Sequence, residues 1–320
     1  MQVKIKKILG NGIFLLGLFL ILNLTSIIFQ PKNNSQEAGM EDVTANGILG
    51  EPEQTIDVLF LSDSVGYCSI IPLQIWRDYG ITSYVCGTPL QPLYYSIEFL
   101  EKAFKTQSPK VVVLETMPIF NEFKEKEALK NRMEQFFPVF RYHDRWKQPK
   151  NFLTEDMTLN IDYTHIVRDK GYHYYRAVDE PVHDGNFEMV SDVAQISEAC
   201  KDAVAKIKEI CDDHGAQLVL IGAPNVVSWR ADRYNAVARL AMELEVAYYE
   251  TNFMREEVPI NWETDAFDGG EHLNYKGAQK FTVFLGKYLD GLGIFEDKHN
   301  QEEYAAWNQN QKEFYDSVTE

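Results

Sequence analysis

The feature that most constrains the fold is a regular alternation of short apolar runs with longer amphipathic stretches. Runs of four to seven residues rich in Val, Ile and Leu are separated by segments whose apolar residues recur every three or four positions. Uninterrupted apolar runs are typical of a parallel sheet that is covered on both faces. The sequence therefore predicts one α/β domain around a mainly parallel five-stranded sheet. The expected strands are 56–61, 83–86, 110–115, 216–222 and 246–250, and the expected helices are 69–79, 94–106, 193–214, 230–244 and 275–289.

A serine stands where the first expected strand should turn into a helix. Ser64 follows Asp63 at this turn. Ligands of open α/β sheets bind at the carboxyl ends of strands, and the N–H groups of a helix N-terminus can stabilise an oxyanion there. Ser64 is therefore a candidate nucleophile, although a serine or aspartate in such a turn also caps helices regardless of function. Asp63 and Asn225, which follows the fourth expected strand, are candidate substrate-binding residues.

A histidine near the C-terminus can supply the base that a serine nucleophile needs. A serine hydroxyl attacks a carbonyl efficiently only when a positioned base takes its proton. His272 lies just before the last apolar helix, with Asp265, Asp268 and Glu271 close by in the sequence. A carboxylate beside the ring can fix its tautomer and stabilise the imidazolium.

These two blocks, in this order and at opposite ends of the domain, resemble those of the SGNH/GDSL hydrolase family. The stretch Phe60-Leu-Ser-Asp63-Ser64 resembles the family's first block, G-D-S, with Ser62 in place of the glycine, and His272-Leu-Asn resembles the last block, D-x-x-H. The resemblance covers about 56–289 apart from an insertion. It implies a three-layer, flavodoxin-like SGNH hydrolase fold, with Ser64 as nucleophile and His272 as base.

The acid of the last block departs from the family pattern. It normally stands three residues before the histidine, where this chain has Gly269. Asp268, one position earlier, is the first choice, ahead of Glu271 and Asp265. Gly269 and Gly270 make such a backbone detour inexpensive, because glycine adopts positive φ readily.

The oxyanion donors match the family only in part. Gly87 resembles the glycine of the second block, whose backbone N–H would act together with that of Ser64. The asparagine of the third block is absent at its expected position, and Thr116 or Asn121 is a candidate replacement. Loss of one such donor commonly costs about 10²–10³ in rate. Glu115, at the end of the third expected strand, is assigned no catalytic role.

An apolar run near the N-terminus predicts a membrane segment. Residues 8–29 are almost wholly apolar and would reach ~33 Å as a helix, enough to cross a bilayer. Lys4, Lys6 and Lys7 precede the run while Lys32 alone follows closely, so the positive-inside rule predicts a cytoplasmic N-terminus and an extracellular main domain. A cleaved signal peptide is the alternative, since 13–22 suits its apolar core, and it gives the main domain the same destination.

Composition divides the chain into an anchor, a tether, a domain with an insertion, and a tail. Residues 1–30 are the expected anchor, 31–54 a polar tether, and 55–295 the hydrolase-like domain with an aromatic-rich insertion at 121–191. Residues 296–320 form a polar tail in which Trp307 and Phe314 are candidate docking points. Aromatic residues of the insertion could stack on sugar rings or pack a small core of their own.

Charge and cysteine content exclude several other classes. Lys and Arg number 31 against 48 for Asp and Glu, a net charge of -17, which disfavours nucleic-acid binding and nuclease or phosphodiesterase action. No metal or organic cofactor is expected. The four cysteines form no metal-binding pair, and Cys68 and Cys86 are either buried free thiols or one disulfide.

Together these features predict a membrane-anchored, extracytoplasmic serine esterase or O-acyltransferase that acts on acyl esters of a cell-surface glycan or polymer. The layout resembles that of the membrane-anchored teichoic-acid D-alanylation (DltD-like) and alginate O-acetylation proteins, which implies a membrane-bound O-acyltransferase as partner. The alternative is a catalytically impaired module that binds glycan or acts as a scaffold. The missing asparagine favours the module, and the retained serine and histidine favour the enzyme.

Overall fold

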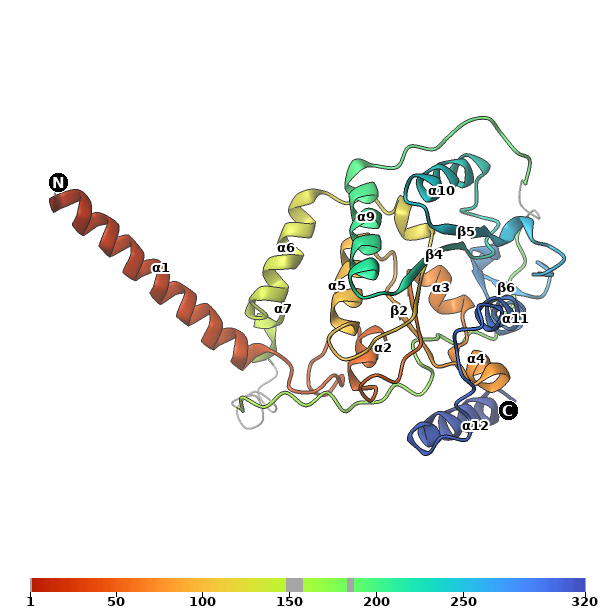
Figure 1. Ribbon diagram of the computed structural model, residues 1–320, viewed down its shortest axis with the longest axis horizontal. Helices are drawn as coiled ribbons and strands as arrows, with labels where there is room; N and C mark the ends of the chain where they lie inside the picture. Colours follow the sequence, from red (N-terminus) through yellow and green to blue (C-terminus); the bar gives the residue numbers. More distant parts are fainter. Residues whose placement is uncertain (1, 148–157, 183–186, 320) are drawn as a thin grey trace. The chain divides into compact units, whose positions relative to one another are not determined.

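The computed structural model describes residues 2–147, 158–182 and 187–319. The chain divides into two compact units, each made of two separate segments (Figure 1). The helical unit comprises Met1–Val43 and Lys124–His165, and the α/β unit comprises Thr44–Phe123 and Ile166–Glu320.

The α/β unit is built on the expected five-stranded sheet. All four neighbouring pairs are parallel and the strand order is β2-β1-β3-β4-β5, the flavodoxin-like arrangement. Each strand begins and ends within two residues of the position expected from the sequence, which confirms the predicted fold class. The strands are β1 (Val58–Ser62), β2 (Ser83–Gly87), β3 (Val111–Glu115), β4 (Gln217–Gly222) and β5 (Ala247–Glu250).

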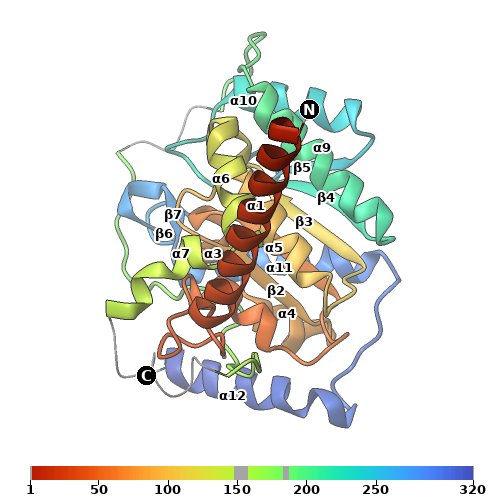
Figure 2. The same cartoon turned by 90° about the vertical axis from the view of Figure 1, so that its left-hand side faces the viewer.

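Helices cover both faces of the sheet, as Figures 1 and 2 show. Successive strand residues point to opposite faces, so Leu59 and Leu61 enter one apolar core while Val58 and Phe60 enter the other. The first core is closed by α5 (Leu93–Ala103), α9 (Glu198–Asp213) and α10 (Ala231–Glu243), and the second by α3 (Ser64–Ser69) and α11 (Tyr275–Gly291).

The helix expected at 69–79 is interrupted. α3 ends at Ser69, Ile70 and Ile71 are extended, and α4 (Pro72–Tyr79) begins at a proline. Proline disfavours the helical conformation in the residue before it but fits the first position of a helix, so Pro72 ends one helix and starts the next.

Part of the expected tether and of the expected tail is folded into the α/β unit. Residues 44–54 belong to this unit, and Ala45 and Ile48 are buried in its core through α2 (Val43–Asn46) and the 3-10 turn η1 (Gly47–Gly50). In the tail, α12 (Ala305–Thr319) packs against α4 and buries Trp307 and Phe314. Residues 44–54 of the expected tether are thus held in the folded unit by apolar contacts and by polar contacts such as the buried pair of Glu51 with Lys170.

Short elements complete the α/β unit. The strands β6 (Ala266–Phe267) and β7 (His272–Leu273) form an antiparallel pair before α11. The remaining 3-10 turns are η2 (Met117–Phe120), η4 (Thr251–Phe253), η5 (Asp268–Gly270) and η6 (Glu302–Tyr304). All four cysteines are buried free thiols, including Cys68 and Cys86.

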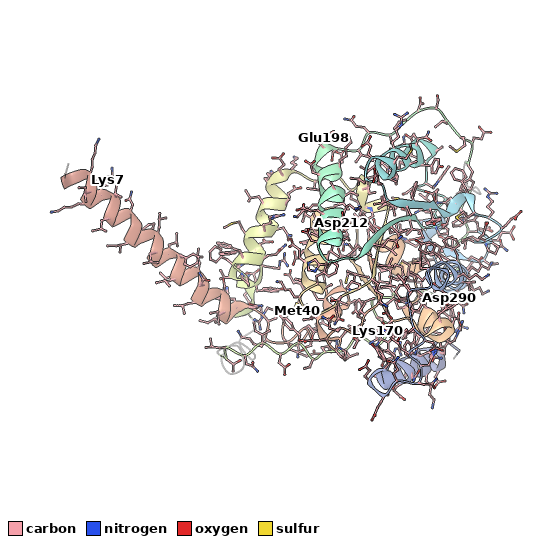
Figure 3. The ribbon with its side chains drawn as sticks, viewed as in Figure 1. Lys7, Met40, Lys170, Glu198, Asp212 and Asp290 are labelled. Carbon is pink, nitrogen blue, oxygen red and sulfur yellow. The ribbon has the colours of Figure 1, made fainter. Side chains whose placement is uncertain are left out.

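The helical unit combines α1 (Gln2–Phe29) with α6 (Glu125–Phe136), α7 (Val139–Tyr142) and the 3-10 turn η3 (His143–Lys147). Within α1, Lys4–Phe29 is long and apolar enough for a membrane span or a signal sequence, and Figure 3 shows its side chains projecting from the ribbon, with Lys7 near the N-terminus. The expected insertion at 121–191 is thus shared between the two units, and its residues 148–157 and 183–186 lie outside the described part of the chain.

Candidate active site

The turn from β1 into α3 fixes Ser64 at the first position of α3. Asp63 caps the helix, since its Oδ1 accepts the N–H of Val65 at 3.0 Å. Gly66 lies so close to Ser62 that a Cβ built on the glycine would fall 1.9 Å from Ser62 Oγ. Ser62 is therefore accommodated by a glycine four residues later.

The loop that carries His272 connects β6 to β7 through three consecutive residues with positive φ. Asp268, Gly269 and Gly270 have φ values of 49°, 72° and 88°. Two of the three are glycines, which adopt this conformation without steric cost, while Asp268 is a type of residue that tolerates it. Asn274 then caps α11, its Oδ1 accepting the N–H groups of Lys276 and Gly277 at 3.0 and 3.3 Å.

The structure brings Ser64, His272 and Asp268 into one hydrogen-bonded chain. Nε2 of His272 lies 2.8 Å from Oγ of Ser64, and Nδ1 lies 2.7 Å from Oδ2 of Asp268. Oδ1 of Asp268 also accepts the backbone N–H of His272 at 3.1 Å. With the ring proton on Nδ1, the free Nε2 faces the serine hydroxyl as an acceptor. α3, which begins with Ser64, contacts both α11 and β7, which begins with His272.

The two other carboxylates considered for this position face different partners. Oε1 of Glu271 accepts the hydroxyl of Ser228 at 2.7 Å. Asp265 is buried, accepts the N–H of Asn261 at 2.7 Å and pairs with Lys280. Asp268 is therefore the carboxylate that contacts the His272 ring, in agreement with the first choice from the sequence.

The residues expected to bind substrate are engaged within the protein instead. Asp63 is 2% exposed, and its Oδ2 accepts the side-chain N–H of Asn121 at 3.1 Å in addition to the helix cap. Asn225 is also 2% exposed, and its Nδ2 donates to the carbonyl oxygen of Glu271 at 2.8 Å. Both side chains brace the segments next to Ser64 and His272, and their role in binding substrate stays a prediction.

The candidate oxyanion donors differ in their availability. The N–H of Ser64 belongs to the first turn of α3, where amides have no intrahelical acceptor, and Gly87 is paired in register with Ser62 at the adjacent strand end. The N–H of Thr116 donates to the carbonyl of Ile221 at 3.0 Å, so the hydroxyl is the only donor that Thr116 can offer. Asn121 uses its side-chain amide on Asp63 and on the carbonyl of Gln91.

Sequence reasoning missed three aromatic residues around this site. Tyr67 lies one helical turn after Ser64, and a hydrogen bond with the Ser64 side chain lowers the Tyr67 pKa, although burial raises it more. Phe267 stacks on the His272 ring at 5.5 Å between centroids, and Tyr175 stacks on Phe267 at 4.4 Å. The i, i+3 spacing of Ser64 and Tyr67 was a usable signal, because such residues share a helix face.

A second buried carboxyl group lies under α3. Glu115 is 1% exposed, its Oε2 accepts the N–H of Met117 at 3.0 Å, and Oε1 has no partner among the described residues. Burial raises the pKa of Glu115 well above its usual range, and the charge of Asp63 raises it further. Burial also raises the pKa of Asp63, while the Val65 N–H, the Asn121 amide and His272 lower it. Two interacting acids, Asp63 and Glu115, are therefore buried beneath the site.

Among the residues that the structure describes, no three His, Cys, Asp or Glu side chains are grouped so as to hold a metal ion. The chemistry open to Ser64, His272 and Asp268 is that of an activated serine hydroxyl.

Comparison with known proteins shows similarity only to the backbone fold of solved structures. No protein-family model and no curated protein matches the sequence. Among solved structures, a lipase/acylhydrolase from Enterococcus faecalis is similar at 11% identity and a TM-score of 0.38, over 74% of this chain and 97% of that one. An acetylxylan esterase from Geobacillus stearothermophilus is similar at 11% identity and a TM-score of 0.37, over 79% and 99%. A GDSL-like lipase from Bacteroides thetaiotaomicron is similar at 11% identity and a TM-score of 0.35, over 73% and 88%. The function is therefore argued from the site itself.

Proposed function

We propose that this protein is an SGNH/GDSL-type serine hydrolase or O-acyltransferase that cleaves carboxylic esters through an acyl-enzyme on Ser64. The observation that carries the proposal is the continuous hydrogen-bonded chain from Ser64 through His272 to Asp268. Ser64 lies 208 positions before His272, yet the three side chains meet with the spacing of a nucleophile, its base and the acid that orients the base.

The geometry assigns a role to each group in the reaction. Nε2 of His272 takes the proton of Ser64 as Oγ attacks the ester carbonyl, and it returns the proton to the departing alcohol oxygen. The acyl group remains on Oγ until water or an acceptor hydroxyl, deprotonated by the same Nε2, attacks it. Asp268 holds the Nδ1 proton and stabilises the imidazolium between these steps. Hydrolysis and transfer differ only in the second nucleophile.

The proposed oxyanion donors lie at the carboxyl ends of β1 and of its two neighbours, β2 and β3. The N–H groups of Ser64 and Gly87 are the proposed backbone donors, with the hydroxyl of Thr116 as a further candidate. The hydroxyl of Tyr67, one helical turn after Ser64, is a third candidate for the donor that the family's asparagine provides. A phenol is well suited to this task because its O–H donates to a developing negative charge.

The proposed substrate is an acylated cell-surface glycan or polymer, and the proposed location is the outer side of a cell membrane. Tyr175, 37% exposed, presents an aromatic ring in the stack that ends on His272, and such a face is suited to packing against a sugar ring. α1 is the proposed single-pass anchor, with the lysines before it on the cytoplasmic side. A membrane-bound O-acyltransferase is the partner that the layout suggests.

The second candidate is a glycan-binding or scaffold module with impaired catalysis. It is favoured by the absence of the third-block asparagine and by the engagement of Asn121 with Asp63 and Gln91. This module would use the same aromatic stack without forming an acyl-enzyme.

A fluorophosphonate probe separates the two candidates, since it reacts with an activated serine. We expect the full-length protein in detergent to be labelled, and Ser64→Ala and His272→Ala to lose labelling. Ser228→Ala, which removes a hydroxyl bound to Glu271 rather than to His272, is the matched control and should stay labelled. A folded wild-type protein that the probe does not label would contradict the enzyme and favour the module.

A further inference from the structure

The helical unit carries an apolar stripe that its own residues leave exposed. Leu129, Met133, Phe136 and Phe140 are spaced at i, i+4, i+7 and i+11 and are 62%, 42%, 63% and 43% exposed. This spacing places Leu129, Met133 and Phe136 on one face of α6, and Phe140 follows on the separate helix α7. Large exposed apolar patches on a folded protein mark a surface that binds another apolar phase.

The stripe is continuous with the apolar surface of α1. The ring of Phe19 lies 6.5 Å from that of Phe136 and 6.0 Å from that of Phe137. Nearer the end of α1, Ser26 Oγ accepts the N–H of Val139 at 3.4 Å. α7 therefore packs on the C-terminal part of α1, and only the C-terminal end of α6 reaches α1, at Phe19, within one compact unit.

If α1 crosses a membrane, the position of Phe19 along the helix determines how deep in the bilayer its contacts with Phe136 and Phe137 lie. Phe19 precedes Phe29, the last residue of α1, by ten residues, or ~15 Å of helix. That is about half the hydrocarbon thickness of a bilayer. With Phe29 at the interface, Phe19 lies near the bilayer centre, and side chains in contact with it lie below the headgroups. In that arrangement the ring of Phe136 would lie among acyl chains rather than in water.

The segment 124–147 carries a net positive charge, unlike the chain as a whole, and a positive charge favours an anionic lipid surface. Between positions 124 and 147 there are seven basic residues and four acidic ones, in a chain whose net charge is -17. At about 100° per residue, Lys126 and Arg132 flank the apolar stripe of α6, whereas Glu127 and Glu134 lie on the opposite side. Basic side chains beside a buried apolar face can reach anionic headgroups while their stems stay in apolar surroundings.

We propose that α6 and α7 lie in the membrane leaflet where α1 ends, with the stripe Leu129, Met133, Phe136 and Phe140 among the acyl chains and the flanking basic residues on anionic lipid headgroups. This inference rests on the proposed membrane anchoring by α1 and adds a second, interfacial contact to it. The segment inserted between β3 and α9 thus has a function separate from the reaction.

Site-specific quenching in vesicles tests the proposal. The four native cysteines are buried, so an introduced cysteine can be labelled selectively with an environment-sensitive fluorophore. The full-length chain is reconstituted into phosphatidylcholine vesicles with one quarter phosphatidylglycerol and lipids that carry a quenching nitroxide on the acyl chain. The label is placed at Phe136→Cys on the stripe, at Glu127→Cys on the opposite face as matched control, and at Leu16→Cys to report α1.

We expect quenching at positions 136 and 16 to exceed that at 127 at least threefold. Quenching at 16 with none at 136 would overturn the inference while leaving the anchor intact, and would assign the stripe to a protein partner. No quenching at 16 or 136 would overturn the anchor and the inference together. Equal quenching at 136 with and without phosphatidylglycerol would overturn the assignment of anionic lipid.

Discussion

The exposed position of Asp268 allows its contribution to catalysis to be estimated and tested. Its carboxylate is 2.7 Å from Nδ1 of His272, but the side chain is 42% exposed. At this separation, Coulomb's law gives the imidazolium about 6 kcal/mol at an effective dielectric constant near 20 and about 1.5 kcal/mol in bulk water. A partly hydrated carboxylate lies between these values, at about 3 kcal/mol, which corresponds to a loss of roughly 150-fold in kcat/KM.

The perturbation is Asp268→Asn, which removes the charge and keeps the size. The backbone N–H of His272 can still donate to the amide oxygen, but an amide N–H directed at Nδ1 favours the tautomer whose proton is on Nε2, where it opposes deprotonation of Ser64. Hydrolysis of p-nitrophenyl acetate by the purified full-length protein measures kcat/KM. We expect the loss to lie mostly in kcat, because the charge matters most once the imidazolium forms.

Glu271→Gln and Asp265→Asn are the matched controls, since each replaces a nearby carboxylate that does not contact the ring. Glu271→Gln keeps an acceptor for Ser228 and should cost less than about threefold. Asp265→Asn weakens the pair with Lys280 and should lower stability more than activity. The reasoning about Asp268 is refuted if Glu271→Gln lowers kcat/KM as much as Asp268→Asn does while both proteins remain folded.

Three further outcomes follow from the site and the core. Tyr67→Phe should lower kcat about tenfold or more with little change in KM and with Ser64 still reactive to the probe; unchanged kcat would exclude the phenol as an oxyanion donor. Burial raises the pKa of Glu115 above its ordinary 4.5, so the folded protein holds a proton that the unfolded chain releases, and stability falls as the pH rises above about 4.5. Urea unfolding between pH 4.5 and 8 should therefore show the stability of wild type falling relative to Glu115→Gln, and a constant difference would contradict this. Lys170 and Glu51 form a buried pair at 2.6 Å, so Lys170→Met should cost about 3 kcal/mol in thermal or urea unfolding, and adding Glu51→Gln should recover part of the loss; a single variant as stable as wild type would refute the prediction.

The central strands β1, β3 and β4 were predictable because each is mostly a continuous apolar run that is buried on both faces. The runs at 111–115 and 217–222 differ from the expected ranges by one residue, whereas the edge strand β5 is only partly buried. Pro72 indicates a helix break in the sequence, but the apolar periodicity around it led to the prediction of one continuous helix over 69–79. The division of the insertion between two units was not predictable, because it depends on contacts between segments about 100 residues apart.

His272 and Asp268 were predictable as partners of Ser64 from the sequence, whereas the contacts of the neighbouring residues Asp63 and Asn225 were not. Ser64 and His272 occupy recognisable blocks, and the choice of Asp268 followed from the glycines that permit its backbone conformation. The burial of Asp63 and Asn225 was not predictable, since a polar residue at the carboxyl end of a strand can face either a ligand or its own protein. Only the three-dimensional neighbours, Asn121 and the Glu271 carbonyl, decide between these roles.

The proposed reactive site and the proposed membrane-contacting surface belong to different units of the chain. Ser64, His272 and Asp268 all belong to the α/β unit, whereas Phe19 and Phe136 belong to the helical unit. Substitutions at sites without shared partners have nearly additive effects, so loss of the hydroxyl at Ser64 should not alter lipid quenching at position 136. Probe labelling and lipid quenching therefore test separate physical claims, and a failure of one leaves the interpretation of the other intact.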